Sequence, residues 1–392
     1  ENAPTAAVVF KTVVDPFVGK LLYFKVVRGK VTADSTLYNP RTGENEKIGK
    51  VLLVRGKKQT EVPFVGAGDI GAVAKLAGTG TGDTLCDPVA PVILPPITFE
   101  APCLSMAVTA KKKGEEDKVA QGMARLMEED PTMRYYVDPQ THESILSGLG
   151  EQHLDVITSR LRAKFGVEVT LSPARVPYRE TIRKKVEAQG KYKKQSGGHG
   201  QYGHVKMTFE PYAEGDYLFE ERTFGGSVPK NFFPSVEKGL RNAVQKGVLA
   251  GYPLVGLKAV LYDGSYHPVD SNDMAFQTAA RLAYQDGIPK AKPTILEPIG
   301  LLKVTIPDAN LGDIMSDISS KRRGTVLGMT AEDGMQTVEA EVPMAEMGSY
   351  TIDLRSMTQG RGSFSCKFVR YEEAPGNVQQ KVIEEAKKEQ EA

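Results

Sequence analysis

Residues 151–171 read Glu-Gln-His-Leu-Asp-Val-Ile-Thr-Ser-Arg-Leu-Arg-Ala-Lys-Phe-Gly-Val-Glu-Val-Thr-Leu, a helix followed by a strand. Leu154, Ile157 and Leu161 recur at helical spacing, and Gly166 is the residue type that most often ends a helix. Val167–Leu171 then predicts a strand. Before this junction come a strand at Ala101–Thr109, a helix and a hairpin. The β-α-β-β-α-β order over 97–172 predicts a ferredoxin-like sandwich.

The same order of elements returns between residues 298 and 372. Leu301–Ile306 predicts a strand, and Asn310–Ser320 predicts a helix with apolar residues at i, i+3, i+4 and i+7. A hairpin follows, then a helix over Ala345–Met357 and a last strand over Ser363–Arg370. We therefore expect two copies of one architecture on either side of a different middle domain.

The remaining segments have their own patterns. Short apolar runs broken by Gly and Pro over residues 1–95 predict a small β-barrel. The middle domain predicts a strand at Leu254–Tyr262 and helices at Pro234–Lys246 and Asn272–Gln285, the second capped by Asp270 or Ser271. A charged helix that frays is expected at the C-terminus.

These patterns predict an elongated α+β chain of several domains. The expected divisions are a barrel over 1–95, a ferredoxin-like sandwich over 96–172, a mixed α/β domain over 173–297, a second ferredoxin-like sandwich over 298–376 and a helical tail over 377–392.

Composition narrows the class of protein without identifying it. The 392 residues carry a net charge of +1, and no apolar run approaches the 18 residues of a membrane helix. The three cysteines are far apart and form neither a metal-binding spacing nor a disulfide framework, which favours a reducing, cytoplasmic setting. We expect a monomer without a membrane partner.

A glycine-rich loop lies inside a strongly basic stretch. Residues 195–202 read Gln-Ser-Gly-Gly-His-Gly-Gln-Tyr, and Arg175–Lys206 contains nine Lys or Arg and two Glu, a net charge of +7. Tyr192 and Tyr202 interleave with the lysines of this stretch. Lysines neutralise phosphates and tyrosines stack on unpaired bases, so the pattern favours a nucleic-acid contact over a solvated ribbon. The basic residues expected to contact RNA are Lys191, Lys193, Lys194 and Lys206.

Catalytic signatures are few. The sequence has no G-x-x-x-x-G-K-[ST] phosphate loop, no H-E-x-x-H and no Cys/His cluster suited to zinc. We therefore expect no cofactor and no metal in this chain. His267 and Asp270, with Ser265 nearby, leave open a self-contained hydrolase, which we disfavour because no G-x-S-x-G elbow is present. His142 and His153 are expected to be structural.

Several motifs in one order resemble elongation factor G, a translational GTPase, from its domain II to its C-terminus. The motifs are Gly148–Asp155, Pro177–Ile182, Gln195–Val205, Leu249–Pro253, Gly264–Asp270 (Gly-Ser-Tyr-His-Pro-Val-Asp), Ala291–Pro293 and Leu354–Ser356. The resemblance implies domains II, III, IV and V: a translation-factor barrel, a ferredoxin-like domain, an S5-like tip domain and a second ferredoxin-like domain. It also implies that the GTPase domain, with its GTP and magnesium, is absent from this chain.

The resemblance further implies a role in GTP-driven movement of tRNA and mRNA. Domain IV would enter the decoding region of the ribosome, so the implied partners are ribosomal RNA, the tRNA–mRNA duplex and the GTPase domain of the same protein. The residues implied to form the ribosome-contacting tip are Ser196, Gly197, Gly198, His199, Gly200, Gln201, Tyr202, Gly264, Ser265, Tyr266, His267 and Asp270.

Two positions depart from the family pattern. The usual factor has Arg at the position of His199 and commonly has Leu at the position of Gln152. These departures indicate a paralogue of the housekeeping factor. Ribosome recycling and tetracycline-type ribosome protection are therefore alternatives to translocation.

Overall fold

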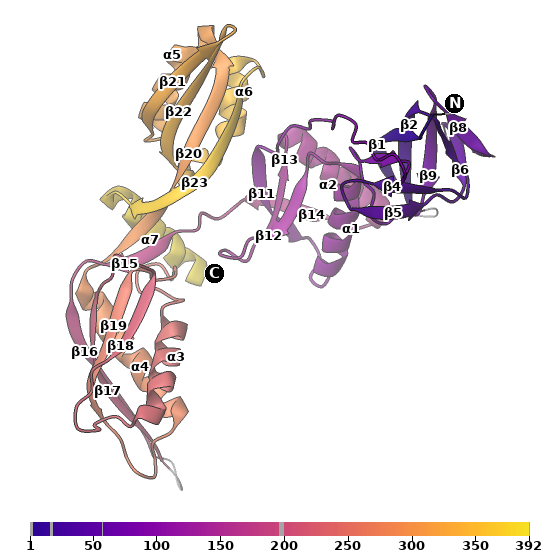
Figure 1. Ribbon diagram of the computed structural model, residues 1–392. Helices are drawn as coiled ribbons and strands as arrows, with labels where there is room; N and C mark the ends of the chain where they lie inside the picture. Colours follow the sequence, from indigo (N-terminus) through magenta and orange to yellow (C-terminus); the bar gives the residue numbers. More distant parts are fainter. Residues whose placement is uncertain (1–2, 16–18, 57, 196–199, 392) are drawn as a thin grey trace. The chain divides into compact units, whose positions relative to one another are not determined.

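A computed structural model describes residues 3–15, 19–56, 58–195 and 200–391. The chain divides into two compact units (Figure 1). The first contains Glu1–Arg175 with Gly348–Asp353, and the second contains Val176–Met347 with Leu354–Ala392. We describe each unit by itself.

An eight-stranded antiparallel sheet opens the first unit, with the order β5-β4-β10-β1-β2-β9-β6-β7. Its strands bend around a core that includes Val9, Leu22 and Phe24, all fully buried. The strands are β1 Ala6–Asp15, β2 Gly19–Arg28, β4 Thr36–Asn39, β5 Glu44–Lys47, β6 Val51–Arg55, β7 Lys58–Val62, β9 Ile70–Ala74 and β10 Thr84–Cys86, and β3 Lys30–Thr32 pairs separately with β8 Phe64–Gly66. The all-β prediction for this segment is confirmed.

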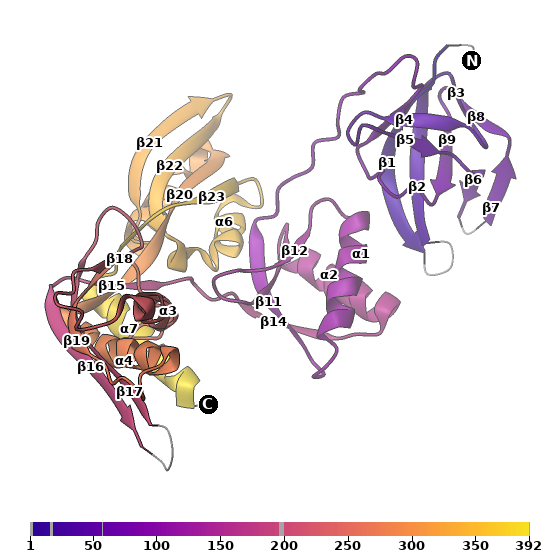
Figure 2. The same cartoon turned by 60° about the horizontal axis from the view of Figure 1, so that its bottom comes forward.

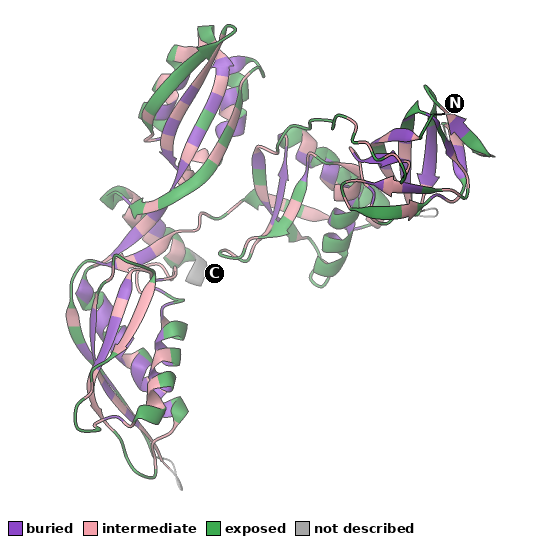
Figure 3. Cartoon of the chain, in the orientation of Figure 1, coloured by how far each residue is buried: buried purple, intermediate pink, exposed green. Residues whose placement is uncertain are grey.

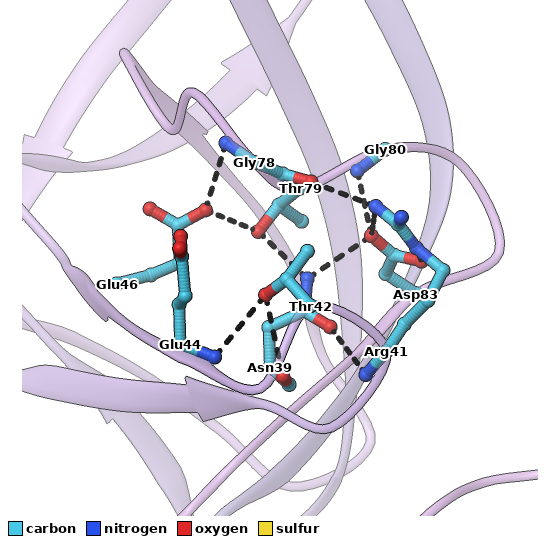
Figure 4. A network of polar contacts seen from close by, with 9 residues as sticks. All are labelled: Asn39, Arg41, Thr42, Glu44, Glu46, Gly78, Thr79, Gly80 and Asp83. Carbon is cyan, nitrogen blue, oxygen red and sulfur yellow. Dashed lines mark hydrogen bonds and ion pairs between the residues drawn. The ribbon is translucent and has the colours of Figure 1, made fainter.

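A buried polar network joins the turn between β4 and β5 to the segment before β10 (Figure 4). The carboxylate of Asp83, 6% exposed, accepts hydrogen bonds from Asn39 Nδ2 at 3.0 Å and from Arg41 Nη2 at 2.7 Å. Glu46 accepts a hydrogen bond from Thr79 Oγ1 at 2.8 Å. Because its buried oxygens have donors, the network holds the two segments together without an unpaired charge.

The rest of the first unit contains the first β-α-β-β-α-β set. Its elements are β11 Leu104–Ala110, α1 Glu116–Glu129, β12 Arg134–Val137, β13 Ser144–Gly148, α2 Glu151–Phe165 and β14 Val169–Pro173. The sheet order is β12-β13-β11-β14, and Met123, Leu146 and Leu161 lie in the core between sheet and helices. His153 accepts a hydrogen bond from the Leu149 amide on Nδ1, and its Nε2 lies 2.8 Å from Asp130. Its predicted structural role is confirmed.

The same order of elements recurs near the C-terminus. The elements are β20 Pro293–Pro307, α5 Leu311–Ser316, β21 Thr325–Glu332, β22 Met335–Pro343, α6 Tyr350–Thr358 and β23 Ser363–Glu373. β23 and β22 flank β20, and β21 pairs with β22. Counted along each set, both sheets therefore have the strand order fourth, first, third, second.

Three helices differ from their predictions. The helix expected over Asn310–Ser320 ends at Ser316 and continues as a π-helical turn over Asp317–Lys321, where Arg322 Nε donates to Asp317. The helix expected over Ala345–Met357 is a 3-10 turn, Met344–Met347, followed by α6. The tail helix α7, Gly376–Glu391, is anchored rather than free, because Val382 is buried against Ile295.

The middle domain is a four-stranded sheet covered by two helices. The sheet order is β16-β17-β19-β18, with β16 Val186–Lys194, β17 Gln201–Pro211, β18 Tyr217–Glu221 and β19 Leu257–Ser265, and the helices are α3 Phe233–Ala243 and α4 Asp273–Gly287. Buried residues run along the central strands (Figure 3). A preceding strand, β15 Arg179–Ile182, pairs with β20 instead.

Two glycines let α4 lie directly on the ribbon formed by β16 and β17. A Cβ added to Gly190 would collide with the backbone of Ala279, and one added to Gly203 would come within 2.6 Å of the Ala275 carbonyl oxygen. The helix begins after Asn272, whose Oδ1 accepts a hydrogen bond from the Ala275 amide at 2.8 Å. The cap predicted at Asp270 or Ser271 is therefore wrong by one or two positions.

Candidate functional site

The start of β17 and the end of β19 lie at one end of the middle-domain sheet (Figure 2), and they carry those predicted tip residues that the structure describes. β16 and β17 are antiparallel with Lys194 opposite Gln201, so the glycine loop leaves the sheet there. β19 is antiparallel to β17, with Ser265 opposite His204, so its following loop leaves at the same end. We call this end of the sheet, where β17 begins and β16, β18 and β19 finish, the tip end.

The basic residues of the ribbon lie mostly on one face. Along β16 the inward positions are Ala188 and Gly190, and along β17 they are Gly203, Val205 and Met207, all of them buried. Side chains alternate along a strand, so the intervening residues point to the outer face. Toward the start of β17 the residues of this outer face are Gln189, Lys191, Lys193, Tyr202, His204 and Lys206, and farther along the ribbon the face continues with Glu187 and Thr208.

Tyr192 does not belong to this face. It packs against the helix-covered core, which answers a question that the sequence left open, namely whether Tyr192 and the lysines share one face. Lys194 lies on the same side of β16 as Tyr192, but it is exposed because it is the last residue of the strand. Lys206 is on the outer face and pairs with Asp263 at 2.7 Å, which neutralises part of its charge.

Two side chains of the outer face, Tyr202 and His204, are joined by Ser265 of β19 in a continuous chain of hydrogen bonds. The Ser265 hydroxyl lies 2.8 Å from the Tyr202 hydroxyl and 2.9 Å from His204 Nδ1. Burial, followed by the charges of Lys191 and Lys206, lowers the pKa of His204 below its usual value. The lowered pKa favours the neutral ring, in which Nε2–H faces Gln189 Oε1 at 3.4 Å and Nδ1 accepts from Ser265.

The 266–270 loop is tied to the glycine loop by backbone contacts. The Tyr202 amide donates to the Asp270 carbonyl at 2.9 Å, and the Gly200 amide donates to Asp270 Oδ1 at 3.0 Å. The Ser271 hydroxyl donates to the Tyr202 carbonyl and accepts from the His267 amide, each at 2.9 Å. Residues from both loops are thus held as one assembly.

His267 is oriented by its own loop and remains accessible. Its Nδ1 accepts hydrogen bonds from the amides of Val269 and Asp270 at 3.3 and 3.1 Å, while half of the side chain is exposed. The same Nδ1 lies 3.4 Å from Asp270 Oδ2. Its ring centroid lies 6.5 Å from that of Tyr202, and Lys191 Nζ lies 5.9 Å from the same tyrosine ring.

This arrangement does not favour the hydrolase alternative. Asp270 Oδ2 lies 3.4 Å from His267 Nδ1, and the other Asp270 oxygen accepts from the Gly200 amide. Ser265, however, is bonded to His204 and Tyr202 rather than to His267. A nucleophile needs a base that is itself oriented by a third group, usually a carboxylate. Besides Ser265, the His204 ring faces the side-chain amide of Gln189 and not a carboxylate, so His204 is not part of a Ser-His-Asp triad. His267 is not part of one either, because Ser265 is bonded to other residues.

The predicted tip residues are distributed as follows. Gly264 and Ser265 lie at the end of β19 and not in a loop, because the strand extends three residues beyond its predicted end. Tyr266 is 46% exposed beyond the strand. Gly200, Gln201 and Tyr202 lie at the start of β17. Ser196, Gly197, Gly198 and His199 lie outside the described residues.

Three residues were not assigned to the tip from the sequence: Gln189, His204 and Ser271, the last of which was considered only as a helix cap. His204 could have been found from strand alternation, since it is two residues from Tyr202 on a predicted hairpin arm.

A second basic cluster in the sequence, Lys321–Arg323, supplies little charge that is free to contact a partner. Arg322 is 2% exposed and bonded to Asp317, and Arg323 forms a bidentate pair with Glu297.

Across the described parts of the chain no three His, Cys, Asp or Glu side chains gather as metal ligands. Among these residues no helix combines the length and apolar character that crossing a membrane requires.

Four family models match consecutive segments of the chain. Residues 4–88 match elongation factor G domain 2, 99–173 match domain III, 174–292 match domain IV and 294–382 match the elongation factor G C-terminus. The chain belongs to the elongation factor G family. None of these four matches is to a GTPase domain, and the segment resembling domain IV is the one that carries the tip.

A solved structure is similar over nearly the whole chain. The crystal structure of ttk003000868 from Thermus thermophilus is 39% identical, with a TM-score of 0.82, over 98% of this chain and 58% of that one. The chain thus spans little more than half the length of this relative.

Proposed function

We propose that this chain is the ribosome-engaging part of an elongation factor G-type protein, and that its tip end contacts RNA in the decoding region during translocation of tRNA and mRNA. The outer face of the β16–β17 ribbon is the observation that carries this proposal. Lys191 and Lys193 point from it beside Tyr202, next to the loop that holds His267. Cations that pair with phosphates, together with rings that stack or donate hydrogen bonds, suit RNA.

The family match supports a role in translation at the ribosome, but it does not distinguish translocation from related roles. Ribosome recycling and ribosome protection remain alternatives to translocation. His199 and Gln152, the two departures from the usual pattern, are the reason to keep them. Complementation by the full-length parent in cells depleted of the housekeeping factor separates translocation from these alternatives.

Salt-dependent binding to purified ribosomes tests the RNA contact. In the Lys191→Ala/Lys193→Ala variant, we expect weaker binding and a slope of log K against log salt that falls by about 0.7–0.9 for each phosphate that the variant no longer neutralises. Lys185→Ala is the matched control, because Lys185 carries the same charge at the far end of the ribbon, where it pairs with Glu210. An unchanged slope in the double variant would show that these lysines form only a solvated face.

A further inference from the structure

Phe224 is the most exposed large apolar side chain among the described residues, at 93%. Isolated apolar residues on a surface are common and need no explanation. This one differs because the backbone around it is rigidly held and because of where it lies in the fold.

The turn that carries Phe224 is well defined. The Phe224 carbonyl accepts a hydrogen bond from the Ser227 amide at 3.4 Å, and Gly225 and Gly226 have φ of 67° and 72°. Two successive positive φ values are the signature of a type I′ turn, which glycine adopts without strain. The ring therefore projects from a tight turn rather than from a loose loop.

Both ends of this turn are fixed to β19. On the entering side, the Arg222 amide donates to the Leu261 carbonyl at 2.8 Å and so continues the pairing of β18 with β19. On the leaving side, Val228 is 1% exposed, and a Cβ on Gly264 would lie 2.6 Å from its methyl group. Close packing against Gly264 holds the leaving strand of the turn next to the last residues of β19.

The topology places Phe224 at the tip end. β18 runs parallel to β19 with Glu221 opposite Leu261, so the chain beyond Glu221 runs in the direction of Ser265. That direction leads to the same end of the sheet as the 266–270 loop. Other exposed apolar side chains of this end are Tyr266 at 46%, Val269 at 61% and Met274 at 62%.

The charges beside the turn indicate what the ring meets. Residues 222–230 contain two basic residues, Arg222, which pairs with Glu220 at 2.6 Å, and Lys230. Both basic side chains are exposed. An exposed aromatic ring on a turn that also carries an exposed lysine matches a single-stranded nucleic acid, in which bases present π-faces and phosphates lie beside them.

We propose that Phe224 stacks on an unpaired RNA base and that the 222–228 turn is an RNA-contacting element of the tip end, in addition to the two loops. This inference rests on the proposed function, since it takes RNA to be the partner of the tip. It adds a stacking residue that is independent of the lysines of the ribbon.

Binding of the 392-residue chain to purified small ribosomal subunits tests the proposal. We expect Phe224→Ala to weaken binding about tenfold, the order that loss of one base–aromatic stack produces. Phe224→Trp retains a ring and should bind as well as the unchanged chain or better. Phe224→Leu retains apolar bulk without a ring and should lose as much as Phe224→Ala. The matched control is Phe64→Ala, a 44% exposed phenylalanine of the N-terminal sheet, which should bind normally.

A second readout locates the contact. Ultraviolet cross-linking of the complex followed by trypsin digestion should leave a nucleotide on the Thr223–Lys230 peptide in the unchanged chain and not in Phe224→Ala. Urea unfolding monitored by circular dichroism should be the same for all four variants, because an exposed side chain on a fixed turn contributes little to stability.

Three results would overturn the proposal. Normal binding by Phe224→Ala would show that the ring makes no contact. Normal binding by Phe224→Leu together with weak binding by Phe224→Ala would assign the ring to an apolar pocket of a protein. A nucleotide adduct that is missing from the Thr223–Lys230 peptide would also count against stacking. If the lysine variants alter the salt slope while the Phe224 variants leave binding unchanged, this inference fails and the proposed function stands.

Discussion

The carboxylate of Asp83 shows how one buried charge is held in the N-terminal sheet. Burial by itself raises the pKa of Asp83, but hydrogen bonds from Arg41, Gly80 and Asn39 favour the charged form more strongly, so the pKa lies below its ordinary value. A carboxyl with a lowered folded pKa stabilises the fold above its unfolded pKa of about 3.8. That contribution is lost as the pH falls through the folded pKa.

We therefore expect Asp83→Asn to lower the stability around β4 and β10 by about 2 kcal/mol at pH 7, because the amide is a poorer acceptor for Arg41. The difference between variant and unchanged chain should shrink as the pH falls below about 3.8. Hydrogen exchange of the β4 and β10 amides measures both the loss of stability at pH 7 and its decrease at low pH. Glu44→Gln, an exposed carboxyl on the neighbouring β5, is the control. A gap of the same size at low pH would contradict this account.

His204 gives a second prediction at the scale of a residue. Its pKa is lowered by burial first and then by Lys191 and Lys206, so its titration midpoint in an NMR experiment should lie below 6.5. Because the folded pKa is lowered, stability from the Tyr202–Ser265–His204 chain is present at neutral pH and declines as the pH falls below about 6.5. Lys191→Ala should move the midpoint upward, whereas Lys185→Ala should not. A midpoint that is the same in all three proteins would exclude the electrostatic contribution.

At the scale of elements, Glu180 connects β15 to the loop before β19. Its side chain is fully buried, and its oxygens accept hydrogen bonds from the amides of Leu249, Ala250 and Gly251 at 2.9 to 3.0 Å and of Tyr252 at 3.3 Å. Since β15 pairs with β20, this carboxylate ties the middle domain to the strand that continues into the C-terminal sheet.

Replacing Glu180 by Gln keeps the shape but puts two donors where backbone donors already point. We expect Glu180→Gln to destabilise the middle domain by about 2–4 kcal/mol, because amides that lose an acceptor in a buried site cannot be rehydrated. Glu221→Gln, an exposed position on β18, is the matched control and should change little. Urea unfolding followed by tyrosine fluorescence would show the loss of stability. Equal unfolding midpoints for the two variants would show that the hydrogen bonds to Glu180 do not stabilise the domain.

For the whole molecule, the expected behaviour toward GTP follows from the absence of a phosphate loop in the sequence. A Walker-type loop supplies the backbone amides and the lysine that hold the phosphates. We expect no saturable binding of labelled GTP at micromolar concentration and no hydrolysis. Repeating the titration with ribosomes present tests whether the chain also fails to bind GTP when it is bound to the ribosome. Saturable binding to the chain alone would disprove this prediction.

The two β-α-β-β-α-β sets show how much of the fold follows from local pattern. Apolar spacing at Leu154, Ile157 and Leu161, with Gly166 after them, predicts α2 closely, and the structure ends that helix at Phe165. The helix predicted over Asn310–Ser320 has equally good spacing, yet it changes to a π-helical turn at Asp317, where a buried ion pair with Arg322 forms. An ion pair between a helix and the residue just after it leaves no periodic signal.

The sequence by itself determined the order of elements, the concentration of charge around the glycine loop and the absence of a phosphate loop. These depend on residue type and on spacing over a few positions. Only the tertiary structure decided which side chains share a face: His204 with Tyr202 and Ser265, Tyr192 in the core, and Phe224 at the tip end. The physical reason is that strand register and sheet order are set by pairing between distant segments, and a shift of one residue turns every side chain of a strand to the opposite face.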